Sequence, residues 1–197
     1  MTHATVVAPP RTPSLVVSHD LGPAAGAALE ELYAAHWRSL VRLAVLLVRD
    51  VPTAEEVVQD AFVAVHGRWS RLREHDKALA YLRQCVVNGA RSVLRRRGTA
   101  ARYAAREAGL ADPARALAPS AEQEAAVGDR RAVVLDALAR LPERQREVLA
   151  LRYYVDLSEA DIADALGISR GAVKSHASRG SSALRASLGH LLEEAHD

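Results

Sequence analysis

The stretch SEADIADALGISRGAVKSHASRGSSAL, residues 158–184, carries the strongest fold signal in the chain. Its first part favours a short helix that Ser158 can cap, and Gly167 permits the left-handed turn that commonly ends a helix. Ser169 can then cap a second helix, on which Val173 would pack back against the first. Two helices that cross at a steep angle need a turn glycine and a branched apolar residue at this spacing. The stretch therefore predicts a helix-turn-helix.

The second helix of this motif places cationic and hydroxyl side chains away from its apolar side. Such side chains suit phosphates and the acceptor edges of bases in the major groove. The candidate DNA-binding residues are Arg170, Lys174, Ser175, Ser178 and Arg179. A helical hairpin with a basic exposed face is the structural alternative. The motif alone also fits repressors, activators and response regulators.

The rest of the chain indicates an all-α protein of two small helical domains joined by a flexible linker. Apolar residues recur at helical spacing almost throughout, and no long stretch alternates apolar and polar residues. Residues 29–98 predict a first domain of three helices, and residues 129–197 predict the second domain. The alanine-rich residues 99–128 predict the linker, and the proline-bearing residues 1–28 predict a disordered extension.

The helices of the first domain have recognisable starts. Thr53 and Glu56 have the spacing of a capping box at the start of the second helix, next to Pro52, and Asp76 is expected to cap the third. The predicted buried stripes of the three helices are Leu29, Tyr33, Trp37, Leu40, Ala44 and Leu47; Val58, Phe62, Val65 and Trp69; and Leu79, Leu82, Val86 and Val93.

Charge is segregated along the chain, although the net charge is only +2. Residues 77–106 hold eight basic side chains and no acid, and residues 168–190 hold four and no acid. Acids gather elsewhere, notably around residues 50–60. This pattern suggests two cationic faces for a polyanion and a separate acidic face, although either run alone could be an ordinary solvated helix face.

The third helix carries a second candidate DNA face. With about 100° between successive residues, Gln84, Asn88, Arg91 and Arg95 line one side, roughly opposite the apolar stripe. An amide and arginines on one rigid face could hydrogen-bond base edges and hold phosphates. A solvated polar face is the alternative interpretation.

Several classes of protein find little support. The single cysteine, Cys85, excludes an internal disulfide framework; a buried structural thiol is the favoured interpretation and a redox sensor the alternative. The longest aliphatic run, residues 43–48, is too short to span a bilayer, and no signal peptide is evident. No histidine pair has metal-ligand spacing, and no glycine-rich phosphate loop occurs. We therefore expect no catalytic residues, no metal, no cofactor, no membrane insertion and a cytoplasmic location.

Three segments together resemble the extracytoplasmic-function group of sigma-70 factors, over roughly residues 29–188. Residues 57–62 (VVQDAF), preceded by Glu55 and Glu56, resemble the helix of region 2.2. Residues 81–97 resemble the adjoining helix that recognises the −10 promoter element. Residues 141–179 are similar to region 4, which reads the −35 element. The order and spacing of the three segments make the resemblance specific.

The resemblance implies a protein that binds core RNA polymerase and directs it to promoters. The acidic helix would dock on the β′ coiled coil, the second domain on the β flap, and an anti-sigma factor is a further candidate partner. The implied polymerase-binding residues are Glu55, Glu56, Gln59 and Asp60. The implied −10 residues are Tyr81, Gln84, Asn88, Arg91, Arg95 and Arg96, which together with the loop of residues 70–77 would capture unstacked bases. For Tyr81, base stacking and core packing are equally supported.

Three positions depart from the family pattern. Ser92 stands where many relatives carry an aspartate, and Gly180 replaces a usual alanine. Gly89 is expected to weaken the third helix locally, because glycine in a helix interior costs about 1 kcal/mol relative to alanine. The competing interpretation of the whole chain is a dimeric helix-turn-helix repressor or response-regulator output module, which would have no use for the first domain.

Overall fold

The computed structural model describes residues 23–69, 77–107 and 129–193. Within these ranges the chain forms seven α-helices and one π-helical turn and has no strand, so the all-α prediction is confirmed. In chain order they are α1 (Pro23–Val48), α2 (Val51–His66), α3 (Ala78–Glu107), α4 (Asp129–Arg140), α5 (Glu143–Leu149), η5 (Ala150–Tyr154), α6 (Glu159–Leu166) and α7 (Arg170–Glu193).

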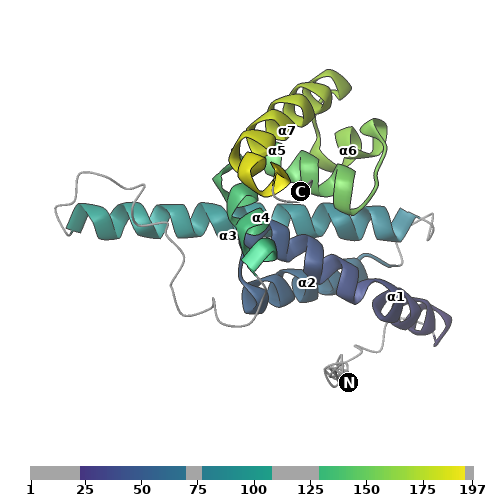
Figure 1. Ribbon diagram of the computed structural model, residues 1–197. Coiled ribbons are helices and arrows are strands. Elements are labelled where there is room, and N and C mark those ends of the chain that lie inside the picture. The colour runs from purple at the N-terminus through teal and green to yellow at the C-terminus, as the bar shows by residue number, and fades with distance from the viewer. Residues whose placement is uncertain (1–22, 70–76, 108–128, 194–197) are drawn as a thin grey trace, which may run out of the picture.

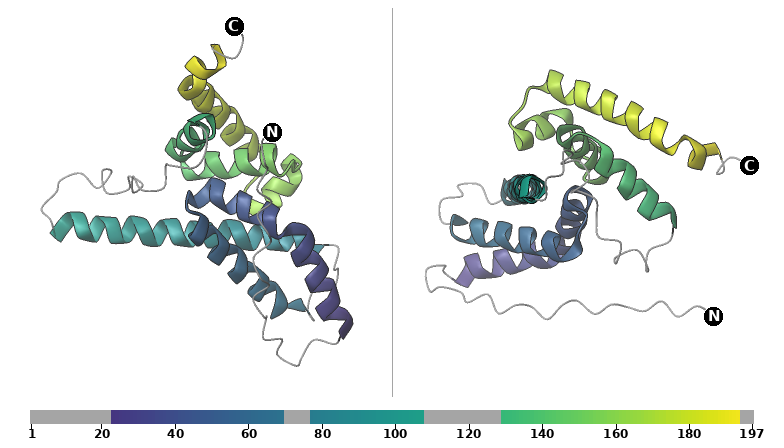
Figure 2. Two further views of the ribbon diagram at one scale, coloured as in Figure 1. Left: turned by 60° about the horizontal axis from the view of Figure 1, so that its bottom comes forward. Right: turned by 90° about the vertical axis from the view of Figure 1, so that its left-hand side faces the viewer.

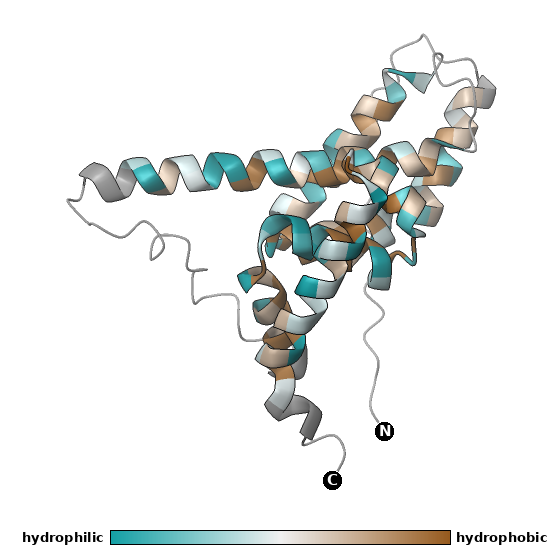
Figure 3. Ribbon diagram, turned by 90° about the horizontal axis from the view of Figure 1, so that it is seen from above, coloured by the Kyte–Doolittle hydropathy of each residue, from teal (hydrophilic) through white to brown (hydrophobic). Residues whose placement is uncertain are grey.

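The long helix α3 lies at the centre of the molecule (Figure 1). Helices α1 and α2 pack on one side of it and complete an N-terminal bundle. Helices α4 to α7 form a C-terminal bundle on its other side, as the end-on view of α3 in Figure 2 shows. The C-terminal part of α3 projects beyond both bundles, and Figure 3 shows hydrophilic residues recurring along it. The helix α3 is thus part of the N-terminal bundle, contacts the C-terminal bundle on its other side, and ends in a projecting C-terminal part.

The N-terminal bundle is built on the predicted apolar stripes. The residues of the α2 stripe, Val58, Phe62 and Val65, are buried together with Trp69, which follows the helix. Aromatic rings join α1 to α2: the centroids of Tyr33 and Phe62 lie 5.1 Å apart in a tilted arrangement. Offset and tilted ring pairs add stabilisation beyond the apolar area they bury. On α3, Leu82 and Val86 are fully buried, whereas Leu79 and Val93 are half-buried.

The turn between α1 and α2 corrects one sequence prediction. The N-cap of α2 is Asp50, whose carboxylate accepts a hydrogen bond from the Thr53 backbone N–H at 2.9 Å. Thr53 therefore lies inside the first turn, and the predicted capping box of Thr53 and Glu56 is wrong. Asp50 prevails because an aspartate just before Val51-Pro52 can reach the free N–H groups. The predicted cap of α3, Asp76, lies outside the described residues.

Two helices run beyond the boundaries predicted for their domains. α1 begins at Pro23, inside the segment assigned to the N-terminal extension, and α3 continues to Glu107, inside the segment assigned to the linker. Residues 99–107 are rich in alanine, the best helix former, so a helix already established through residue 98 can propagate into them. The rest of both segments lies outside the described residues.

The helix-turn-helix has the predicted geometry. Ser158 caps α6 by accepting from the Asp161 N–H, and Gly167 ends it in the left-handed conformation with φ of 63°. The Ser169 hydroxyl accepts from the Ala172 N–H at 3.1 Å and starts α7. Ile162 and Val173 are fully buried where the two helices meet. Each local signal therefore led to the structural feature expected of it.

Candidate nucleic-acid interface

The recognition helix α7 exposes all of its candidate DNA-binding side chains. Val173 and Ala177 are buried against the bundle. The exposed residues are Arg170, Lys174, Ser175, Ser178 and Arg179. The arrangement exposes cations and hydroxyls on one helix, as contact with phosphates and base edges requires.

Sequence reasoning missed a neighbouring part of this surface. Arg152 and Tyr153, from η5, line an open hollow of about 250 Å³ with Lys174 and Ser178. Tyr153 is 69% exposed. The carboxylate of Glu159 lies 3.2 Å from Arg152 and 3.7 Å from Lys174, so it holds both cations at the hollow. The available signal was the sequence Arg152-Tyr153-Tyr154 directly after the apolar run of residues 148–151.

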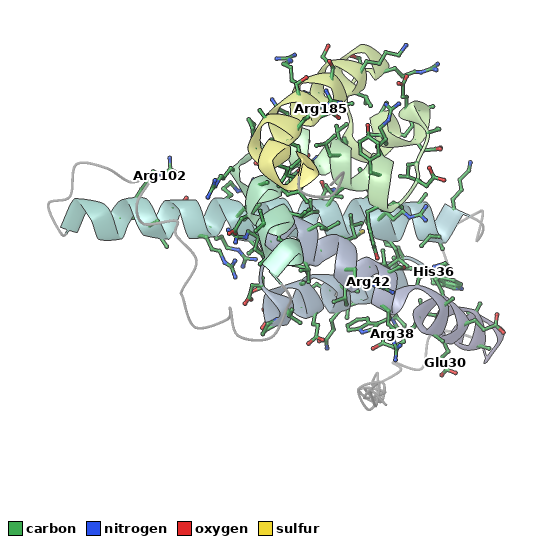
Figure 4. All side chains as sticks on the ribbon, viewed as in Figure 1. Glu30, His36, Arg38, Arg42, Arg102 and Arg185 are labelled. Carbon is green, nitrogen blue, oxygen red and sulfur yellow. The ribbon has the colours of Figure 1, made fainter. Side chains whose placement is uncertain are left out.

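The candidate residues of α3 fall into two groups. Asn88, Arg95 and Arg96 are exposed, whereas Gln84 and Arg91 are half-buried. Among the described residues, the guanidinium groups of Arg95 and Arg96 bond only Ser92 of their own helix, at 3.4 Å, so they can turn to an external anion at little cost. Farther along, Arg102 points away from the bundles on the projecting part of α3 (Figure 4). This end of α3 is an accessible basic surface.

Tyr81 is held inside the N-terminal bundle. It is half-buried against the apolar core, and Arg68 donates a hydrogen bond to its hydroxyl at 2.6 Å. The Arg68 guanidinium also lies 5.8 Å from the centroid of the ring. These contacts supply a packing role for Tyr81, so its role in base stacking stays a prediction.

Arg97, which follows Arg95 and Arg96 on α3, has structural partners. Arg97 donates hydrogen bonds to the Val48 carbonyl at 3.2 Å and to the Thr53 hydroxyl at 2.6 Å. Its guanidinium also lies 3.5 Å from the Asp50 carboxylate. Arg97 therefore ties α3 to the end of α1 and the start of α2, whereas Arg95 and Arg96 remain open.

Arg91 makes the strongest polar contact of the α3 face, and its partner lies in the C-terminal bundle. Its Nε and Nη2 donate to the two carboxylate oxygens of Glu147 at 2.5 and 2.8 Å. Glu147 is only 2% exposed. Burial of this carboxylate was missed, although Glu147 stands four residues before the apolar Leu151, which follows in η5. That spacing was the signal that could have found it.

Further contacts join the two bundles. Arg49, in the turn after α1, pairs with Asp136 of α4, and the Tyr154 hydroxyl donates to the Ser39 carbonyl at 3.3 Å. The side chain of Arg83 on α3 faces Asp161 of α6; burial lowers the pKa of Arg83, and the carboxylate opposes that shift. The two bundles therefore meet along α1 and α3.

The acidic face of α2 consists of Glu55, Glu56, Gln59 and Asp60, which are all exposed. The apolar residues of the same helix, such as Val58 and Phe62, are fully buried on its other side. Burial, reinforced by the Glu55 charge, raises the pKa of Tyr33 on the neighbouring helix α1. The acidic face of α2 is a solvent-facing surface, as the sequence predicted.

The described residues offer few other groups that could bind a metal or react. No group of three or more potential metal ligands comes together among them. Cys85 is half-buried, and burial raises the pKa of its thiol. None of the helices described is both long and apolar enough to cross a membrane.

Two family models match the chain over these surfaces. Residues 32–100 match the model of sigma-70 region 2, which covers most of the N-terminal bundle. Residues 131–184 match the model of sigma-70 region 4, which covers α5, α6 and most of α4 and α7.

Curated relatives extend the similarity over most of the chain. The RNA polymerase sigma-E factor of Streptomyces avermitilis is 33% identical over 159 residues, which are 81% of this chain and 84% of that protein. The ECF RNA polymerase sigma factor SigM of Mycobacterium tuberculosis is 32% identical over 164 residues, covering 83% of this chain and 79% of that protein.

Solved structures share the fold. The sigma factor RpoE of Bartonella quintana, in complex with the anti-sigma factor NepR, matches with a TM-score of 0.64 and 22% identity over 81% of this chain and 96% of that chain. CnrH, in complex with the cytosolic domain of CnrY, matches with a TM-score of 0.59 and 25% identity over 84% of this chain and 95% of that chain.

Proposed function

The chain belongs to the extracytoplasmic-function group of the sigma-70 family, and we propose that it reads two promoter elements through α7 and α3. As a sigma factor it directs promoter-specific initiation of transcription by RNA polymerase. Sigma factors are not enzymes, so the role requires no catalytic residue of this chain. The protein acts where polymerase and promoter DNA are found, which is the cytoplasm.

The C-terminal bundle is proposed to read the −35 element. The observation that carries this assignment is the exposure of the α7 cations and hydroxyls around a rigid, buried Val173. A recognition helix of this kind enters the major groove and contacts base edges and phosphates. Arg170, Lys174 and Arg179 would hold or read the duplex, and Ser175 and Ser178 would add hydroxyl contacts.

The N-terminal bundle is proposed to bind the −10 element and the polymerase on separate sides. Asn88, Gln84 and Tyr81 lie in the N-terminal half of α3, and Arg95 and Arg96 lie in its C-terminal half. The acidic face of α2, through Glu56 and Asp60 among others, would dock on the β′ coiled coil of core polymerase, and the C-terminal bundle on the β flap. An anti-sigma factor, such as the one bound to the Bartonella protein, is a further proposed partner.

A run-off transcription assay with core polymerase and a promoter library tests these assignments. The library is randomised at both elements. Lys174→Ala and Arg179→Ala should alter selection at the −35 element, by about 1–3 kcal/mol for a lost base-edge contact. Asn88→Ala should alter selection at the −10 element. Arg185→Ala, exposed farther along α7, serves as the control. If Asn88→Ala changes only −35 selection, or Arg179→Ala only −10 selection, the assignments are reversed.

A further inference from the structure

The last turns of α3, residues 98–107, extend beyond both bundles as a helical arm (Figure 1). Among the side chains described, Val93 is the last of α3 to pack against an apolar cluster, and Arg97 is the last to bond another helix. Residues 101–107 also lie after the match to sigma-70 region 2 and before the match to region 4. Neither packing within a bundle nor the two family matches therefore account for this arm.

The arm prolongs the proposed −10 face. Asn88, Arg95 and Arg102 follow one another at intervals of seven residues, so each is turned by only about 20° from the one before. All three are exposed. Arg96 and Tyr103 form a second row at the same interval, and Tyr103 is 66% exposed. One broad side of α3 thus runs from the proposed −10 residues out along the arm.

The exposed arginines of this side are not neutralised within the described part of the chain. Arg102 bonds only groups of its own helix there, the nearest being the Gly98 carbonyl at 3.1 Å. Arg95 and Arg96 also bond only their own helix. The sequence has no acid anywhere in residues 77–106. Arginines without carboxylate partners on a rigid helix complement a polyanion, and guanidinium groups are strong partners of phosphate.

The length and composition of the arm fit the backbone of duplex DNA. A rise of about 1.5 Å per residue places Arg102 about 21 Å beyond Asn88, which equals about six base pairs. Residues 99–107 hold no asparagine or glutamine, the amides that read adenine, whereas arginine, threonine and tyrosine can bond phosphates of any sequence. The chain continues from the arm to the C-terminal bundle, the proposed reader of the −35 element. The arm is therefore expected on the −35 side of the −10 contacts.

We propose that the arm of α3 is a third DNA contact, in which Arg102 binds a backbone phosphate of the duplex between the −10 and −35 elements. The phosphate lies about six base pairs from the contact of Asn88. This inference rests on the proposed −10 role of α3 and adds to it a contact that is independent of base sequence. The arm strengthens binding to every promoter and changes the preference for none.

Substitutions of Arg102 isolate the arm, because Arg102 is not one of the proposed −10 residues. Arg102→Ala removes a charge from an exposed position and puts a strong helix former there. Arg102→Lys keeps the charge. Arg38→Ala is the matched control, since it removes the same charge from an exposed position on α1, away from the arm (Figure 4).

The first measurement is equilibrium binding of two labelled DNA probes by polymerase that carries each full-length variant. The short probe ends at the −35 side of the −10 sequence selected most strongly from the randomised library. The long probe continues there for about ten base pairs of random sequence, one turn of DNA, without a −35 element. Wild type, Arg102→Lys and Arg38→Ala should bind the long probe several-fold more tightly than the short one. Arg102→Ala should lose most of this gain.

The second measurement is the salt dependence of binding to the long probe. In Arg102→Ala the slope of log K against log salt should become shallower by about 0.9, because one phosphate of the duplex is no longer neutralised. The slopes of Arg102→Lys and Arg38→Ala should equal that of wild type.

Three results would overturn the proposed contact. The first is equal behaviour of Arg102→Ala and Arg38→Ala on the long probe. The second is a loss for Arg102→Ala that is the same on both probes, because the added duplex would then not be the partner. The third is weaker binding of Arg102→Ala to core polymerase without DNA, which would make polymerase the partner of the arm.

The library assay separates this inference from the proposed function. If wild type selects both promoter elements and the added duplex brings no gain, the arm contact is wrong and the promoter-reading roles stand. If wild type selects neither element, those roles fail. Binding of the free full-length protein to a random-sequence duplex of about three turns then decides the arm contact alone. A salt dependence of Arg102→Ala as steep as that of Arg38→Ala on this duplex would disprove it.

Discussion

The acidic face of α2 and the polar face of α3 were both predicted from the sequence as binding surfaces, yet the structure treats them differently. Glu55, Glu56 and Asp60 lie in solvent on α2. On α3, Arg91 is covered by the C-terminal bundle and bound to Glu147. The position of a residue along a helix shows whether its side chain faces the apolar core of its own bundle or points away from it. It does not show whether another part of the chain covers that side.

The largest expected difference between the two regions is in stability. Leu151→Ala should lower the free energy of unfolding by about 2–5 kcal/mol, because Leu151 is fully buried in the cluster shared by both bundles. Val63→Ala, on the exposed surface of α2 with 54% of the residue accessible, should change it by less than about 0.5 kcal/mol. Urea unfolding measures both. Similar losses for the two variants would mean that the bundles do not share a core in solution.

The next largest expected effect concerns the binding of core polymerase to the acidic face of α2. Reversing charge with Glu56→Lys and Asp60→Lys together should weaken binding to core polymerase by at least about tenfold, or 1.4 kcal/mol, without loss of helicity. The control is Glu30→Lys with Glu31→Lys on α1, where both acids are exposed and the change of net charge is the same. Equal affinities for the two double variants would contradict the docking role of α2.

Much of the fold could be predicted from short stretches of sequence, because the caps, turns and apolar stripes depend on residues close together in the chain. The Ser158 cap, the left-handed Gly167 and the buried Val173 depend on neighbours within one or two turns. The ion pair of Arg91 with Glu147 joins residues 56 positions apart, and no local pattern encodes such a pairing. The same limit applies to the Asp136 pair, since both of its members look like ordinary surface charges in the sequence.

The glycines that depart from the family pattern also have causes beyond their own helix. A Cβ at Gly89 would lie 3.0 Å from Val57 Cγ1, and one at Gly180 would lie 3.1 Å from Leu149 Cδ1. Gly89 therefore lets α2 approach α3, and Gly180 lets α5 approach α7. Sequence reasoning counted only the cost of glycine in a helix. A close contact between two helices compensates for this cost, and the sequence of either helix alone does not reveal that contact.

Two glycines of α3 turn this point into a smaller prediction. Gly89→Ala should destabilise the protein by about 1 kcal/mol, because Val57 is buried and β-branched and cannot easily rotate away from the new methyl. Gly98→Ala should instead stabilise it by up to about 1 kcal/mol, since a Cβ there meets nothing within 4 Å. Both values come from urea unfolding. Stabilisation by both substitutions would show that α2 and α3 are not closely packed at Gly89.

The smallest expected effect is a difference of thiol reactivity between the packed side of α3 and the open face of α2. Burial raises the pKa of the Cys85 thiol, although contacts with Tyr81 and Arg68 oppose the shift. The thiolate is the reactive form, so a raised pKa leaves less of it at pH 8 and slows alkylation. The reference is Ala64→Cys in a Cys85→Ser background, because residue 64 is exposed on α2. Iodoacetamide should modify wild-type Cys85 several-fold more slowly than the new cysteine, and the difference should vanish in denaturant. A Cys85 that reacts as fast as the reference in the folded protein would instead favour a role as a redox sensor.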